Sequence, residues 1–132
     1  MRLSYNKWLA CLLVLVMLAL VAMCCLGANY LRNVSADLLT DLADLEPQVQ
    51  AENWPQARQT SQRSLGDWQA VRRIWLSLLP HQDVINIDTA FISMQAFLQE
   101  EKPEEVLNQL ALLQYHLTLV AENEKLNWHN FF

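Results

Sequence analysis

The stretch from Trp8 to Ala28, WLACLLVLVMLALVAMCCLGA, decides how this chain is organised, because it holds no charged side chain. Its 21 residues would rise about 30 Å as a helix, which matches the hydrocarbon core of a bilayer. Each leucine or valine in it favours insertion by about 0.3–0.6 kcal/mol. The sequence therefore predicts a transmembrane anchor over residues 1–31 and a soluble domain over residues 32–132.

Two other interpretations of this apolar segment stay open. A cleaved signal peptide also has basic residues before an apolar run, here Arg2 and Lys7, but its apolar core usually spans about 7–15 residues. Cys24 or Cys25 would suit a lipidated N-terminus, although Met23 stands where a small residue is expected. The length of the run favours an anchor that is retained.

The residues at the two ends of the span predict its orientation. Two basic residues precede it, whereas Arg32 alone follows it before Arg58. Because positive charge favours the cytoplasmic side, we expect a single-pass cell-membrane protein with a cytoplasmic N-terminus and an extracytoplasmic domain. Trp8 and Tyr30 are expected to lie in the two membrane interfaces, where aromatic side chains are enriched.

The soluble region is acidic and poor in turn-forming residues. Fourteen acidic and six basic residues follow residue 32, which gives a net charge near −8 and disfavours nucleic acid as a partner. The region has a single glycine, and its apolar residues recur at helical spacing. We therefore expect an all-α domain, an antiparallel four-helix bundle built from two helical hairpins.

In the first predicted hairpin, one helix begins near Leu38 and kinks or ends before Pro47, which cannot donate a backbone hydrogen bond. The next helix should begin at Asn53, in a capping box with Gln56, and stop at Pro80. Asp44 is expected opposite Arg63, and Asp37 opposite Arg72 or Arg73. The residues predicted to face the core are Leu38, Leu42, Leu45, Val49, Trp54, Ala57, Ser61, Ser64 or Leu65, Trp68, Val71, Trp75 and Leu78.

In the second predicted hairpin, Asp83 caps the third helix and Pro103 opens the fourth, beside two carboxylates that favour a helix N-terminus. A shift of 49 residues lays the first apolar pattern onto the second. This fits either a duplication or two unrelated hairpins with similar turns. The residues predicted to face the core here are Ile87, Phe91, Met94, Leu98, Val106, Leu110, Leu113, Leu117 and Val120.

Residues that usually carry catalysis or bind metals form no recognisable motif. His81, His116 and His129 lie outside any His-Glu-x-x-His pattern, and the three cysteines all lie in the apolar run. Packing of the third and fourth helices could bring Asp88 near His116, which gives at most two metal ligands. We expect no enzyme activity, no cofactor and no metal site.

The end of the chain is rich in aromatic residues. Its last seven residues include Trp128, Phe131 and Phe132, which is unusual for a solvated terminus. These side chains are expected either to pack on the domain itself or to bind in a groove of a partner.

Several large apolar residues and a few polar ones carry a resemblance that covers essentially the whole chain. They are Asn53 and Trp54 with Ala57, Trp68, Trp75, His81, the stripe from Ile87 to Leu98, Leu110 to His116, Glu124 to Asn127, and Asn130 with Phe131. In this order they resemble the bacterial domain-of-unknown-function family 4363. The resemblance implies an anchored helical domain from a Gram-positive-type bacterium, whose partner is a small multi-span membrane protein. Trp128 and Phe132 depart from the family's usual aliphatic ending.

Two functions fit these features. The first is a non-enzymatic interaction or accessory subunit for another membrane protein, which the missing catalytic motifs and the aromatic tail favour. The alternative is a membrane-tethered extracytoplasmic ligand-binding or sensor domain, with Trp54, Trp68 and Trp75 lining a pocket. No small-molecule substrate is evident from the sequence.

Overall fold

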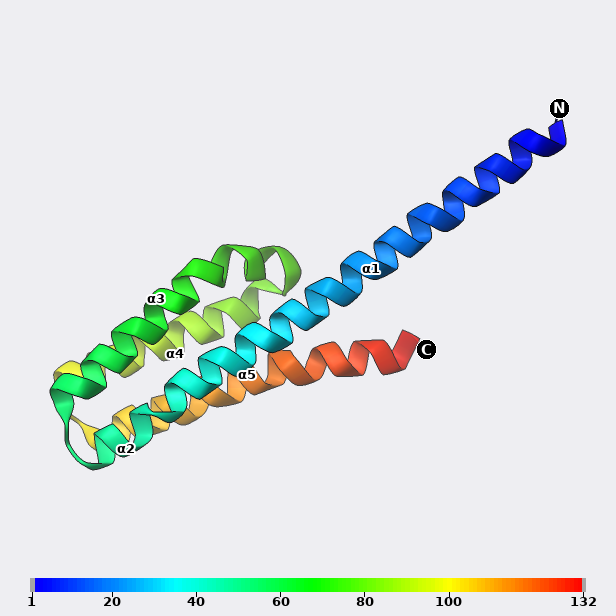
Figure 1. Cartoon of the computed structure of the whole chain (residues 1–132). Helices are drawn as coiled ribbons and strands as arrows, with labels where there is room; N and C mark the ends of the chain where they lie inside the picture. Colours follow the sequence, from blue (N-terminus) through cyan, green and yellow to red (C-terminus); the bar gives the residue numbers. More distant parts are fainter. Residues whose placement is uncertain (1, 132) are drawn as a thin grey trace. The chain divides into compact units, whose positions relative to one another are not determined.

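The computed structural model describes the backbone of residues 2–131 and the side chains of residues 4–122. All regular elements in this part of the chain are helices: α1 (Arg2–Ala43), α2 (Leu45–Gln50), α3 (Trp54–Leu78), α4 (His81–Gln99) and α5 (Pro103–Phe131) (Figure 1). The chain divides into two compact units, residues 1–30 and 31–132. The predicted all-α class, an apolar N-terminal helix followed by a helical bundle, is confirmed.

The first unit is the apolar part of α1. An 18-residue window within it has a mean hydropathy of 3.1, so by length and composition this helix can cross a membrane. Its large apolar side chains are exposed, as is Trp8, and Tyr30 lies at the end of the unit. Along a helix the 22 steps from Trp8 to Tyr30 rise about 33 Å, close to the thickness of a bilayer core.

The second unit begins within α1, because no break separates the apolar segment from the predicted first bundle helix. That helix ends at Ala43, and α2 starts at Leu45. Pro47 explains the break, since it has no N–H to donate to the carbonyl of Ala43, four residues earlier. The predicted kink before Pro47 is therefore confirmed.

The turns inside the two hairpins have the same backbone geometry. Glu52 and Glu101 both have positive φ angles, 58° and 56°. In each turn the next residue donates its N–H to a carbonyl five positions back, Asn53 to Gln48 at 2.9 Å and Lys102 to Phe97 at 3.1 Å. A residue with positive φ followed by this backbone hydrogen bond forms the Schellman motif at the C-terminus of a helix, where glycine is the usual residue. The 49-residue equivalence of the sequence thus extends to the turn conformation.

Two predicted helix caps are wrong. The Asn53 amide makes no hydrogen bond to the backbone of α3, and instead donates to Gln56 Oε1 at 2.8 Å. Helix α4 begins at His81 after Pro80, so Asp83 lies within the first turn and not before it. Its carboxylate remains close to the positive helix end, which favours a negative charge there.

The core of the bundle forms where α4 packs against α5 and α3, and where α2 packs against α3 and α5. Figure 1 shows α4 and α5 running side by side in opposite directions. Trp68 and Trp75 are fully buried, with ring centroids 5.1 Å apart in an edge-to-face arrangement. Phe91 stacks on Trp68 at 6.4 Å. Such aromatic pairs contribute about 0.5–1.5 kcal/mol beyond the area they bury. All nine predicted core residues of the second hairpin are buried.

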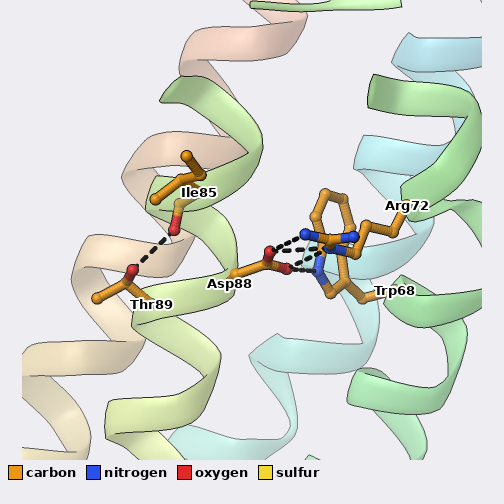
Figure 2. Close-up of polar contacts among 5 residues, drawn as sticks. All are labelled: Trp68, Arg72, Ile85, Asp88 and Thr89. Carbon is orange, nitrogen blue, oxygen red and sulfur yellow. Dashed lines mark hydrogen bonds and ion pairs between the residues drawn. The ribbon is translucent and has the colours of Figure 1, made fainter. Parts of the chain in front are cut away.

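A half-buried carboxylate joins α3 to α4. Asp88 accepts a hydrogen bond from Trp68 Nε1 at 2.7 Å, and Arg72 donates to both of its oxygens at 2.7–3.0 Å (Figure 2). The hydrogen bond and charge of Asp88 raise the pKa of Arg72 above its ordinary value. The indole N–H of a buried tryptophan therefore has a charged acceptor.

The ion pairs of the structure differ from those predicted from the sequence. Arg72 pairs with Asp88 and not with Asp37, because it lies on the side of α3 that faces α4. The carboxylate of Asp88 contacts Trp68 and Arg72 on α3. Among the described side chains the ion pairs are Arg58 with Glu101, Arg72 with Asp88, and Lys102 with Glu100, and Asp44 with Arg63 is not one of them.

Replacing Glu52 with glycine should raise the free energy of unfolding by about 1 kcal/mol, because glycine adopts positive φ without the steric cost that other residues carry. Urea unfolding of the full chain in mild detergent, followed by tryptophan fluorescence, measures the change. Gln62→Gly is the control, since Gln62 lies inside α3 and should lose about 1 kcal/mol. A loss of stability in Glu52→Gly would contradict the positive φ.

Replacing Asp88 with alanine should lower the free energy of unfolding by about 2–3 kcal/mol, because the buried Trp68 N–H loses its acceptor. The same urea titration measures this loss. Glu101→Gln breaks the exposed pair with Arg58 and should cost less than about 1 kcal/mol. Equal effects from the two changes would show that Asp88 is not a special link between the hairpins.

Candidate interaction groove

An open groove of about 510 Å³ lies between the last turns of α1 and the middle of α3. Both walls belong to the second unit. Its volume falls in the range of binding sites, about 300–1,000 Å³, but it is open to solvent along its length. The residues that line it are Val34, Asp37, Leu38, Thr40 and Asp41 from α1, and Asp67, Ala70 and Val71 from α3.

Three carboxylates, Asp37, Asp41 and Asp67, crowd this groove. Burial raises the pKa of Asp41, and the hydrogen bond and negative charge of Asp67 raise it further. Asp37 acts in the same direction, and the positive charge of Arg63 opposes these effects. A hydrogen bond between two carboxyl groups requires a shared proton, so the groove disfavours having all of its acids ionised.

The second hairpin provides an internal comparison, because its helices meet without these carboxylates. Forty-nine residues after Asp37, Asp41 and Asp67 stand Asn86, Ala90 and His116, none of which is acidic. Ala90 is only 4% exposed, and α4 packs against α5. The open groove of the first hairpin therefore coincides with three carboxylates at positions where the second hairpin has none.

Two of the α3 residues that were predicted to face the core are not buried. Val71 is half-buried and forms part of the groove wall, and Leu78 is 47% exposed. Ile74, between them, is 48% exposed. Val71, Ile74 and Leu78 recur at helical spacing, so an uncovered apolar edge extends beyond the groove along α3.

The three tryptophans of α3 do not line the groove. Trp68 and Trp75 are fully buried and Trp54 is 9% exposed. They pack as core residues, and none of them is among the residues that line the groove. Sequence patterning alone does not distinguish a tryptophan that fills a core from one that lines a pocket.

Trp8 and Tyr30 are not among the residues that line the groove. Trp8 is exposed on the apolar part of α1. The helix α5 runs to Phe131, but the side chains of Trp128, Phe131 and Phe132 lie outside the described residues. No group of three or more His, Cys, Asp or Glu residues suited to a metal ion occurs within the described part of the chain.

The acidic groove itself was not predicted. Asp37 was assigned to an ion pair, and Asp41 and Asp67 were not connected with each other. The 49-residue alignment contained the necessary signal, since it places Asp41 opposite a position where the second hairpin has a buried alanine. When one hairpin has a charged residue at a position where the other hairpin buries an apolar residue, the helix face that carries the charge is expected to stay uncovered.

Comparison with known proteins assigns this fold to a family. Residues 25–131 match the family model described as Domain of unknown function (DUF4363), which covers most of the chain. The chain belongs to this family, as the resemblance of its sequence had indicated. No match was found among curated proteins or among solved structures.

Replacing Asp41 with asparagine should stabilise the domain at pH 7 by up to about 1 kcal/mol, because it removes a crowded charge. The pKa of Asp41 is raised in the folded state, so its protonation stabilises the wild-type domain below the unfolded value of 3.8. This stabilisation is lost as the pH rises through the higher folded value. The gap between variant and wild type should therefore close as the pH falls.

Urea titrations of the full chain at several pH values measure this gap. Asp44→Asn is the matched control, since Asp44 is exposed at the end of α1 and does not line the groove. If the difference in the free energy of unfolding between Asp41→Asn and the wild type stayed constant across the acid range, the raised pKa of Asp41 in the folded state would be disproved.

Proposed function

We propose that this protein is a non-enzymatic accessory subunit, held in the cell membrane by α1, that binds another membrane protein through the groove between α1 and α3. The groove is the observation that carries the proposal. It has a volume of about 510 Å³, and an uncovered apolar edge on α3 continues it. An apolar surface of this kind on a folded domain commonly marks a site where a partner binds.

The membrane anchor supports the choice of a membrane protein as the partner. Val34, in the α1 wall of the groove, comes four residues after Tyr30, the interface residue predicted at the end of the span. Four residues extend at most about 14 Å, whatever the arrangement of the two units. If α1 spans the bilayer, the groove therefore begins near the membrane surface, where another membrane protein is the nearest partner.

The distribution of charge supports the rest of the proposal. The bias of basic residues toward the N-terminus favours an extracytoplasmic domain. A net charge near −8 after residue 32 disfavours nucleic acid and anionic lipid headgroups as ligands. Binding without catalysis is favoured because no sequence motif for nucleophilic, metal or nucleotide chemistry is present.

Photocrosslinking in the native membrane tests this function. A photoreactive amino acid replaces Ala70, which is exposed and lines the groove, or Gln69, which is exposed on α3 but does not line it. We expect one discrete crosslinked product from position 70, to a protein that stays in the membrane after an alkaline wash, and none from position 69.

The crosslinked product tests the orientation of the domain and the kind of partner. A partner residue in an extracytoplasmic segment supports the proposed orientation, and one in a cytoplasmic segment contradicts it. A product that contains two copies of this chain, or a small ligand that blocks the crosslink from position 70, would argue against a heteromeric accessory subunit. The second of these results would favour the sensor alternative.

A further inference from the structure

We propose that the groove accommodates a basic amphipathic helix of the partner, with apolar side chains between α1 and α3 and a lysine or arginine among Asp37, Asp41 and Asp67. The inference rests on the proposed function and specifies the chemistry of the partner. A segment of this kind next to a transmembrane helix would lie near the membrane surface, at the level of the groove.

The walls of the groove suit the apolar side of a helix. Val34 and Leu38 on α1 face the groove together with Ala70 and Val71 on α3. These side chains are branched or small, which leaves space for larger side chains from a partner. Ile74 and Leu78 lie three and seven residues beyond Val71, and both are exposed on α3. Helices that bind in grooves place their apolar residues at this same spacing.

The charge of the groove favours a cation. Three carboxylates face it, whereas the only cation that acts on Asp41 is Arg63. Arg72 is not available to them, because it forms an ion pair with Asp88. Burial, and then the hydrogen bond and charge of Asp67, raise the pKa of Asp41. An added lysine or arginine would offset this negative charge, and a charge-assisted hydrogen bond to a carboxylate is roughly twice as strong as a neutral one.

The internal comparison separates a binding groove from an accident of packing. The second hairpin has the same apolar pattern and the same turn conformation, yet its helices close over Ala90. The first hairpin could therefore close in the same way if its carboxylates were neutral. It keeps charged residues at the positions that prevent closure, and these charges would be neutralised by a basic partner.

Peptide binding to the full chain in nanodiscs of zwitterionic phosphatidylcholine tests this inference. The probe is a labelled helical peptide of about 15 residues, with leucines along one face and two lysines beside them. Its control has glutamates in place of the lysines, and empty nanodiscs provide the background. We expect fluorescence anisotropy to show micromolar binding, on the order of 8 kcal/mol, of the lysine peptide and at least about tenfold weaker binding of the glutamate peptide.

Matched variants separate the groove from the overall acidity of the domain. Asp41→Asn with Asp67→Asn should weaken binding of the lysine peptide by about tenfold or more, which corresponds to about 1.4 kcal/mol. Glu104→Gln with Glu105→Gln removes the same charge from exposed positions in the first turn of α5 and should change binding by less than about twofold. Circular dichroism establishes that each variant keeps its helical content.

Three outcomes would overturn the inference. These are equal binding of the lysine and glutamate peptides, an equal loss in the two double variants, and capture of the peptide by a photoreactive residue at position 69 but not at position 70. A cellular crosslink from position 70 combined with any of them would leave the proposed function standing and reject only the basic partner. Peptide binding without a cellular crosslink would reject the proposed function and support the chemistry of the groove.

Discussion

The carboxylate of Asp88 fixes how the two helical hairpins fit together. It accepts hydrogen bonds from the fully buried indole of Trp68 and from Arg72, so α3 cannot slide along α4 without leaving a buried N–H unpaired. The aromatic contacts of Trp68 with Trp75 and Phe91 are set by the same register. Through this link the second hairpin holds α3 in place, and α3 forms one wall of the groove.

The two hairpins differ in what a few polar side chains do to the same framework. Both have the same spacing of apolar residues, and both turn through a glutamate with positive φ. In the second hairpin, Ala90 allows its helices to meet. In the first, Asp41 and Asp67 bring like charges together along the open groove, and burial together with the hydrogen bond and charge of Asp67 raises the pKa of Asp41. The closed hairpin thus supports the core, and the open one provides a surface.

Much of the fold could be predicted from local rules. Helical spacing identified the buried faces of the bundle helices except at Val71 and Leu78 on α3, and the positions of Pro47, Pro80 and Pro103 marked helix ends, because proline acts on its own backbone. The caps at Asn53 and Asp83 were wrong because a short polar side chain chooses among several nearby partners.

The groove could not be predicted in the same way. Whether Arg72 pairs with Asp37 or Asp88 depends on which helix lies beside it, and no local pattern determines that. The failure of the α3 stripe at Val71 and Leu78 has the same origin, since a helix face is buried only if another helix covers it. Family membership added no information about these side chains.

The width of the groove has a consequence for how the domain responds to its surroundings. Repulsion between the carboxylates acts over a distance that dissolved ions shorten, from about 8 Å at physiological ionic strength to about 3 Å at 1 M salt. Concentrated salt would therefore weaken the repulsion between these carboxylates. In the proposed extracytoplasmic orientation, the opening of the groove would then change with the salinity of the medium, without any change in the core.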